Sequence, residues 1–395
     1  MASHQAQTSI DDSTHSAGSR DGGSAAVTHQ ILPSNELQLL PPEVIVERSL
    51  RVESVILTPS SFARQYQQAK NCPKLQVYVN IGKGMQGTVF EKIGNPYALK
   101  KETPVTNTGR TLEEELQLHT LVYEAFQKHG PTVDTAVKVP RPHRLIHKSD
   151  HEFWAENASK FSPTDQNRTT AMQMERILPL PKVLRKALIS CFHPTPDPVT
   201  VARILDRTPD KHCLVRTYLG RKNRAEPLTD AEFSLRNFQL FLDPMKEMSL
   251  DVMSLATWTG QAFAIMHWGA GVDGDDVEFV LGTSTTNVTN MARPDLQHRL
   301  IGFYLLDFGQ CQSVDLFNAE VDEVYQRFKA AMIMGDNQLF IPHPKEVELF
   351  RAFSEAYRKT ARLLLKERGL DGRFDVEDFF QEYIEYTEDF LPSNY

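Results

Sequence analysis

Three glycines followed directly by strand-like segments place the strongest limit on how this chain folds. The glycines lie in Gly82-Lys-Gly84-Met-Gln-Gly87, and the β-branched run Thr88-Val-Phe-Glu comes immediately after them. A turn at Gly94-Asn95 and a second run, Tyr97-Ala-Leu-Lys100, complete the pattern of a hairpin. Glycines allow backbone amides to approach an anion that side chains would block. The pattern argues against a dinucleotide-binding fold, because that fold needs a helix directly after its glycines.

Lys100 is the candidate cation of this hairpin. Side chains two residues apart in a strand point to the same side, so Ala98 and Lys100 share a face. Ala98 would leave room for a flat base, while Lys100 would reach phosphate groups; a glycine-rich flap with such a lysine covers the ATP phosphates in kinases. Lys101 points to the opposite face and is the poorer candidate. The alternative is an ordinary hairpin with an exposed lysine.

The segment after the hairpin predicts a helix that supplies a partner for this lysine. Thr111 and Glu114 have the spacing of a capping box at its start. Glu115 has apolar neighbours one, three and six residues later, so we expect it to face inward and to bind Lys100. Glu113, Glu114 and Glu124 are alternative partners for Lys100. The remaining alternative is that these acids form a solvated face of the helix and do not bind Lys100.

Two apolar segments in the C-terminal half are flanked by acidic residues. Asp273 lies five residues before Glu278, and the run Ile301-Gly-Phe-Tyr-Leu-Leu306 ends in Asp307-Phe-Gly. The spacing from Asp273 to Glu278 equals that from the catalytic aspartate to the metal-binding asparagine in the kinase pattern H-R-D-x-x-x-x-N. We therefore interpret Asp273 as the group that orients or deprotonates an acceptor hydroxyl. Glu278 and Asp307 are the candidate ligands of Mg²⁺, which prefers hard oxygen donors.

In this order the candidate residues resemble those of the protein-kinase-like superfamily. More narrowly, the chain is similar to a fungal domain family of unknown function that is often labelled "zinc finger protein". The resemblance covers roughly residues 75 to 345. The motifs that carry it are Met174-Glu-Arg-Ile-Leu-Pro-Leu-Pro181, Cys213-Leu-Val-Arg-Thr-Tyr-Leu-Gly220, Phe233-Ser-Leu-Arg-Asn-Phe238, His267-Trp268, Asp276-Val-Glu-Phe-Val-Leu-Gly282 and Leu306-Asp-Phe-Gly-Gln-Cys311.

The resemblance implies a bilobal α+β fold with a β-rich N-lobe and a mainly helical C-lobe. We expect the N-lobe to span residues 43–175 and the hinge and C-lobe to span residues 176–395. Residues 1–42 are rich in small and polar residues, so we expect a disordered tail. The resemblance also implies that the segment around Met174 to Ile177, which includes Glu175, is an inter-lobe hinge whose backbone binds adenine, with ATP and Mg²⁺ as cofactors.

Several positions depart from the kinase pattern. Gly271 and Val272 stand where H-R-D has its His and Arg, and Glu278 stands where the metal-binding Asn would be. No A-P-E follows Asp307, and the chain soon enters the helical pattern near Val321. Little room is left for an activation loop that would dock a protein substrate. Two functions therefore stay open, a phosphotransferase acting on a small or unusual acceptor and a pseudokinase serving as a regulatory or scaffold domain.

Composition and sequence patterns argue against other classes of function. The 51 acidic residues outnumber the 43 basic ones, and a net charge of -8 argues against a nucleic-acid partner. No apolar run is long enough to span a membrane, and no secretory signal is present, so we expect a cytoplasmic or nuclear protein. A third hypothesis, a zinc-binding nuclear factor, has no support, because no metal-ligand spacing relates the four cysteines, Cys72, Cys191, Cys213 and Cys311.

Overall fold

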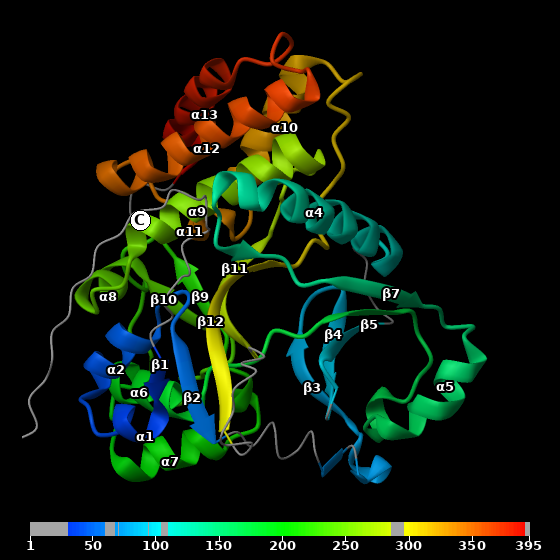
Figure 1. Cartoon of the computed structure of the whole chain (residues 1–395), viewed down its shortest axis with the longest axis vertical. Helices are drawn as coiled ribbons and strands as arrows, with labels where there is room; N and C mark the ends of the chain where they lie inside the picture. The colour runs from blue at the N-terminus through cyan, green and yellow to red at the C-terminus, as the bar shows by residue number, and fades with distance from the viewer. Residues whose placement is uncertain are drawn as a thin grey trace, which may run out of the picture.

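The computed structural model is a mixed α+β protein with two β-sheets (Figure 1). It describes residues 31–59, 68–69, 71–93, 95–103, 110–285 and 296–391. The first 30 residues of the expected tail lie outside these ranges. The rest of that segment corrects the prediction, because β1 (Ile31–Pro33), α1 (Ser34–Leu37) and the start of α2 (Pro42–Ser49) form there. Leu32 and Leu37 are buried in the main core, which explains the order.

The smaller sheet contains the predicted hairpin. All of its pairings are antiparallel, and β-branched and aromatic residues supply the strand propensity. The turn residue Gly94 lies outside the described residues, whereas the pairing of Phe90 with Leu99 confirms the hairpin itself. The strand order is β3 (Tyr78–Lys83), β4 (Gly87–Lys92), β5 (Tyr97–Glu102), β8 (Ala171–Glu175) and β7 (Pro142–Ile146).

Helix α4 (Leu112–Val133) begins with the predicted capping box. The Thr111 hydroxyl accepts a hydrogen bond from Glu114 N at 3.2 Å, and Glu114 Oε2 accepts one from Thr111 N at 2.8 Å. Of the four acidic candidates on this helix, Glu115 is buried, whereas Glu113, Glu114 and Glu124 are exposed. The expectation that Glu115 faces inward is therefore confirmed.

The C-terminal half is mainly helical, as expected, and it also contributes strands to the larger sheet. Two of its strands form a long antiparallel pair in that half. Strand β2 pairs with β12, so residues 43–59 pack with the C-terminal half and not with the expected N-lobe. The strand order is β1, β2 (Val55–Pro59), β12 (Leu296–Leu306), β11 (Glu278–Thr285), β9 (Val215–Tyr218) and β10 (Phe238–Phe241), and β6 (Val137–Lys138) pairs with β12.

The predicted C-terminal helices pack together beyond the larger sheet, at the top of Figure 1. A π-helical turn at Ile265–Ala270 extends α9, and the His267 and Trp268 rings are fully buried there. Both rings bond the Tyr357 hydroxyl, at 2.8 and 2.9 Å, so they pack the end of this helix against α12. These helices are α9 (Val252–Ala264), α10 (Val321–Ile333), α12 (Val347–Arg368) and α13 (Val376–Phe390).

The remaining helices are shorter than these. Helix α6 packs against α2, and α7 packs against α6. None of the helices in the described ranges is long and apolar enough to cross a lipid bilayer. The bounds are α5 (His151–Asn157), α6 (Lys182–Phe192), α7 (Pro198–Asp206), α8 (Leu242–Glu247) and α11 (Asn337–Phe340), with 3₁₀ turns at Pro73–Leu75, Ala158–Lys160, Pro163–Asp165 and Pro209–His212.

Candidate functional site

A cavity of about 220 Å³ lies where the two sheets meet. The smaller sheet contributes the glycine hairpin and β5, and the larger sheet contributes β9, β11 and the end of β12. Helix α4 and the segment that follows β8 complete the walls. The structure brings all but one of the predicted site residues to this cavity, namely Gly82, Gly84, Gly87, Lys100, Glu115, Glu175, Glu278 and Asp307.

Lys100 binds two carboxylates at one end of the cavity. Its Nζ lies 2.7 Å from Glu115 Oε1 and 3.1 Å from Asp307 Oδ1. The Lys100 and Glu115 side chains are buried, whereas the Asp307 side chain is 39 % exposed. Three elements far apart in sequence, β5, α4 and the end of β12, therefore converge on one ammonium group, and only one of its two carboxylates remains accessible.

The charge of Lys100 is stabilised within this cluster. Burial alone lowers the pKa of a lysine, but the negative charges of Asp307 and Glu115 outweigh it, so the pKa of Lys100 is raised. Burial raises the pKa of Glu115, and the nearby Lys100 ammonium opposes that shift. Two acids around one base leave the cluster with an excess of negative charge, which suits a divalent cation bound beside Asp307.

The backbone at Asp307 adopts a conformation that is uncommon outside glycine. Its φ angle is 67°, in the left-handed region, where Asp is more tolerated than most residues. The next residue, Phe308, is buried against the His119 ring, with ring centroids 4.9 Å apart. This packing and the bond to Lys100 hold the Asp307 carboxylate toward the cavity. Non-glycine residues in this region often occur at functional sites.

His119 is a cavity residue that the sequence interpretation missed. It lies four residues after Glu115 on α4, and residues at this spacing share a helix face. The spacing could therefore have predicted that His119 faces the same cavity as Glu115. Its Nε2 is 2.6 Å from the Pro140 carbonyl oxygen, and it also lines the cavity. Burial is the main cause that lowers the pKa of His119 to about 4. The ring is therefore neutral near pH 7 and donates to the Pro140 carbonyl.

The glycine hairpin is closed over the Asp-Phe-Gly segment. Gly84 N donates to Gly87 O at 2.9 Å, and a Cβ at Gly87 would lie 2.6 Å from the Lys101 carbonyl oxygen. The buried Gln86 side chain donates from Nε2 to Gly309 O. A Cβ at Gly309 would collide with that side chain. Gln86, which the sequence interpretation did not single out, thus connects the hairpin to the segment after Asp307.

The expected hinge has most of its amides engaged within the protein. Glu175 N donates to Arg141 O at 2.8 Å, and Arg176 N donates to Pro96 O at 3.0 Å. The Glu175 carboxylate is exposed and accepts a hydrogen bond from Arg141 N at 3.0 Å. Backbone contacts to a base at these two amides would require their present bonds to break. Ile177 is the neighbouring position that also lines the cavity.

Glu278 lies at the cavity but is bound by an arginine. Arg216, on the adjacent strand β9, donates from Nη2 to Glu278 Oε1, and its Nη1 lies 3.6 Å from Asp336 Oδ2. Burial raises the pKa of Glu278 to about 7, although Arg216 opposes the shift and Asp307 adds to it. A metal ion would have to compete with Arg216 for this carboxylate. Nothing in the sequence pattern indicated that β9 would bring an arginine here.

Asp273 is the one predicted site residue that does not line this cavity. It is 2 % exposed, and its Oδ1 accepts hydrogen bonds from Gln312 N at 2.8 Å and from Asp275 N at 3.3 Å. Burial raises its pKa. It borders a separate surface hollow together with Arg327. In this arrangement Asp273 connects its own loop to the segment after Asp307.

Comparison with protein-family models and with curated proteins finds no match for this sequence. The chemistry of the site therefore follows from its own geometry. A charged ammonium beside a glycine hairpin can hold phosphate oxygens, and the accessible carboxylate of Asp307 can hold a hard cation. No group of three or more His, Cys, Asp or Glu side chains arranged to hold a metal ion occurs within the described ranges.

Proposed function

We propose that the cavity between the two sheets binds a nucleoside triphosphate, with ATP as the expected ligand, in the manner of a kinase-like domain. The observation that supports this most directly is the position of Lys100, fixed between Glu115 and Asp307 beside the glycine hairpin. An ammonium fixed in this way can neutralise phosphate oxygens without reorganising. Apolar residues, among them Ala98 and Leu306, line the same cavity and would accept a base.

Magnesium fits this site as an ion carried by the nucleotide. Mg²⁺ is commonly held by one or two carboxylates together with phosphate oxygens and water. Asp307 has an accessible carboxylate, whereas Glu278 is bound to Arg216. Asp307 would be the main protein ligand, and Glu278 would join only if it separated from Arg216. Bound Mg²⁺ would supply further neutralisation of the phosphate charge.

Two observations favour nucleotide binding without turnover, the pseudokinase alternative. Asp273, the expected base, is buried and accepts two backbone hydrogen bonds away from the cavity. Glu278 is paired with Arg216. A phosphotransferase would need a carboxylate near the acceptor hydroxyl, so transfer to a small acceptor is the second candidate and requires the Asp273 loop to rearrange. A cytoplasmic or nuclear location, where ATP and Mg²⁺ are present, belongs to the same proposal.

The proposal is tested by the thermal stability of the full chain with ATP, with and without Mg²⁺. Ligand that binds only the native state should raise stability by about 2.7 kcal/mol at a hundredfold excess over its Kd. We expect the shift to be lost in Lys100→Ala and Asp307→Asn and kept in the exposed control Lys148→Ala. No shift with any nucleotide in the parent protein would reject the proposal.

Turnover is tested separately by the release of ADP or phosphate. If the protein binds ATP without turnover, it should release ADP and phosphate no faster than the Asp307→Asn variant does. A release rate that falls in Asp273→Asn, with ATP binding retained, would support the phosphotransferase and reject the pseudokinase alternative.

A further inference from the structure

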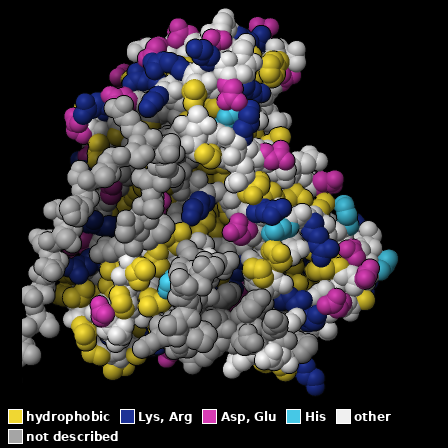
Figure 2. Space-filling model, in the orientation of Figure 1, with side chains coloured by type: hydrophobic (Ala, Val, Ile, Leu, Met, Phe, Trp, Pro, Cys, Tyr) yellow, Lys and Arg dark blue, Asp and Glu magenta, His cyan; other side chains and the backbone are white. Residues whose placement is uncertain are grey.

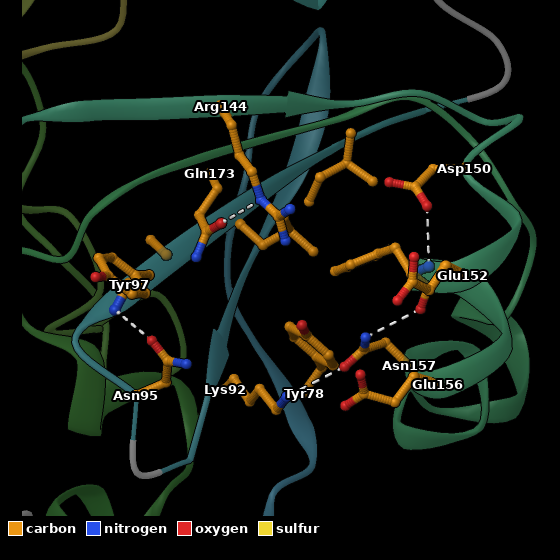
Figure 3. A pocket seen from close by; sticks show the side chains of 14 residues that line it. Tyr78, Lys92, Asn95, Tyr97, Arg144, Asp150, Glu152, Glu156, Asn157 and Gln173 are labelled. Atoms are coloured by element: carbon orange, nitrogen blue, oxygen red, sulfur yellow. Dashed lines mark hydrogen bonds between the residues drawn. The ribbon is translucent and has the colours of Figure 1, made fainter.

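A second pocket, of about 330 Å³, lies on the opposite face of the smaller sheet (Figure 3). Its apolar floor contains the buried Leu99 and Ile146, and α5 forms one wall. Leu99 precedes Lys100 on β5, and successive side chains of a strand point to opposite faces. This outer pocket is therefore distinct from the cavity proposed to bind nucleotide. Its volume is at the lower end of the range for small-molecule sites.

Two cations of the outer pocket have neutral hydrogen-bond partners. Arg144 Nε donates to Gln173 Oε1 at 3.0 Å, and Lys92 Nζ donates to Asn157 Oδ1 at 3.1 Å. Neither Arg144 nor Lys92 lies within ion-pair distance of a carboxylate in the described part of the chain. Figure 3 shows Arg144 and Lys92 entering the pocket from different sides. Both residues therefore present positive charge to the pocket.

The Lys92 environment strengthens the case for an anionic group. Lys160 Nζ also lies near Asn157 Oδ1, at 3.4 Å, so two ammonium groups share one neutral oxygen. Burial is the main cause that lowers the pKa of Lys92, the charge of Lys160 adds to the effect, and the Glu156 carboxylate opposes it. An anionic group in the pocket would add to the effect of Glu156 and favour the charged form of Lys92.

The wall formed by α5 carries the opposite charge. Glu152 and Glu156 lie four residues apart and therefore share a helix face. Glu156 already binds Lys160 at 2.9 Å, and Asp150 caps the helix by accepting a hydrogen bond from Phe153 N. Glu152 has no ion-pair partner in the described ranges, so it is the acid of this wall that is open to a cation. Figure 2 shows side chains of both signs over this side of the molecule.

We propose that the outer pocket binds a small zwitterion of the α-amino-acid class, with its carboxylate at Arg144 and its ammonium at Glu152. A simple anion would be repelled by the acidic wall, and a simple cation would be repelled by the two basic residues. The rings of Tyr78, Tyr97 and Phe153 line the pocket and would pack on the side chain of such a ligand.

The test is calorimetric titration of the full chain with a panel of the standard free amino acids. Whichever amino acid binds is then compared with its N-acetyl derivative, which lacks the ammonium, and with its amide, which lacks the carboxylate. We expect each derivative to bind roughly tenfold more weakly or worse, because each loses hydrogen bonds to a charged group. Failure of every amino acid in the panel to bind, or equal binding by the derivatives or by inorganic phosphate, would overturn the proposal.

Variants locate the site. Arg144→Gln and Glu152→Gln change exposed side chains and should each weaken binding roughly tenfold or more. Lys148→Gln, an exposed change outside the pocket, should leave the affinity unchanged. ATP should not compete, because it is proposed to bind the other face of β5. Unchanged affinity in both pocket variants, or competition by ATP, would contradict the assignment, whereas a failure of ATP binding alone would leave it standing.

Discussion

Two adjacent lysines of β5 lie on opposite faces of the smaller sheet and have opposite electrostatic environments. Lys100 faces the cavity between the sheets and binds Glu115 and Asp307, and its pKa is raised. Lys101 faces the outer side, and burial lowers its pKa to about 8. Both residues are buried. Burial alone therefore does not decide the charge state of a lysine, because the groups that surround the ammonium determine the sign of the shift.

The partners of Lys101 explain the difference. Its Nζ donates to the Asp165 carbonyl oxygen at 2.5 Å and to Asn167 Oδ1 at 2.6 Å, both neutral acceptors. It also lies 5.6 Å from the centroid of the Trp154 ring and 5.3 Å from that of Phe161. Such contacts satisfy an ammonium without neutralising it. Lys101 thus connects the segment after α5 to the sheet, whereas Lys100 belongs to a charged cluster.

The largest effect should come from breaking the cluster on the cavity face. Lys100→Met leaves Glu115 buried without its cation and should lower the free energy of unfolding by about 3 kcal/mol. Urea denaturation measures this effect. The double variant Lys100→Met/Glu115→Leu should recover most of the loss, because an apolar pair replaces a buried ion pair at little cost. A double variant as unstable as the single one would show that Glu115 is not the cause.

The next effect concerns the glycine hairpin over the same face. Gly87→Ala should lower the free energy of unfolding by about 2 kcal/mol, because its Cβ would lie 2.6 Å from the Lys101 carbonyl oxygen. Gly84→Ala is the matched control, because the nearest atom to its Cβ is 4.0 Å away. Chemical denaturation of both variants tests the difference. Equal losses would mean that the close approach at Gly87 is not what requires glycine.

The two lysines should also differ in how their contribution to stability depends on pH. The folded-state pKa of Lys101 is about 8, below the ordinary 10.5, so the unfolded state binds more protons between these values. Relative to Lys101→Met, the parent protein should therefore gain stability as pH rises from about 8 toward 10.5. Lys100, whose pKa is raised, should show no such gain against Lys100→Met, because its contribution is lost only above its ordinary pKa. Urea titrations at several pH values measure both differences. If the stability difference from the parent protein depends on pH in the same way for Lys100→Met and Lys101→Met, the two lysines do not differ in pKa as proposed.

The smallest effect concerns the helix that brings Glu115 to Lys100. Thr111→Ala removes the hydroxyl that accepts a hydrogen bond from Glu114 N, and it should cost about 1 kcal/mol. Thr111→Ser keeps the acceptor and should cost much less. The two variants are compared by thermal denaturation. If they lose the same stability, the methyl group and not the cap is responsible.

The local sequence pattern was sufficient to predict which side chains of the smaller sheet face the cavity. Strand alternation placed Ala98 and Lys100 on one face and Lys101 on the other, and helical spacing with a capping box turned Glu115 inward. These inferences hold because alternation in strands and the 3.6-residue helical repeat depend on neighbours within a few residues. The Asp-Phe-Gly segment after an apolar strand also predicted Asp307 as a site residue, but its contact with Lys100 joins segments far apart in sequence.

Only the tertiary structure decided which distant segments became neighbours. The sequence could not show that β2 would pair with β12, that Arg216 would form an ion pair with Glu278, or that Asp273 would lie outside the cavity. The outer pocket likewise needs α5 folded over β3, β4, β5, β7 and β8. Sequence alone determined the glycine hairpin, α4 and their inward faces, because those follow from local geometry. Contacts between elements depend on how the whole chain buries its apolar surface, and no short pattern encodes that outcome.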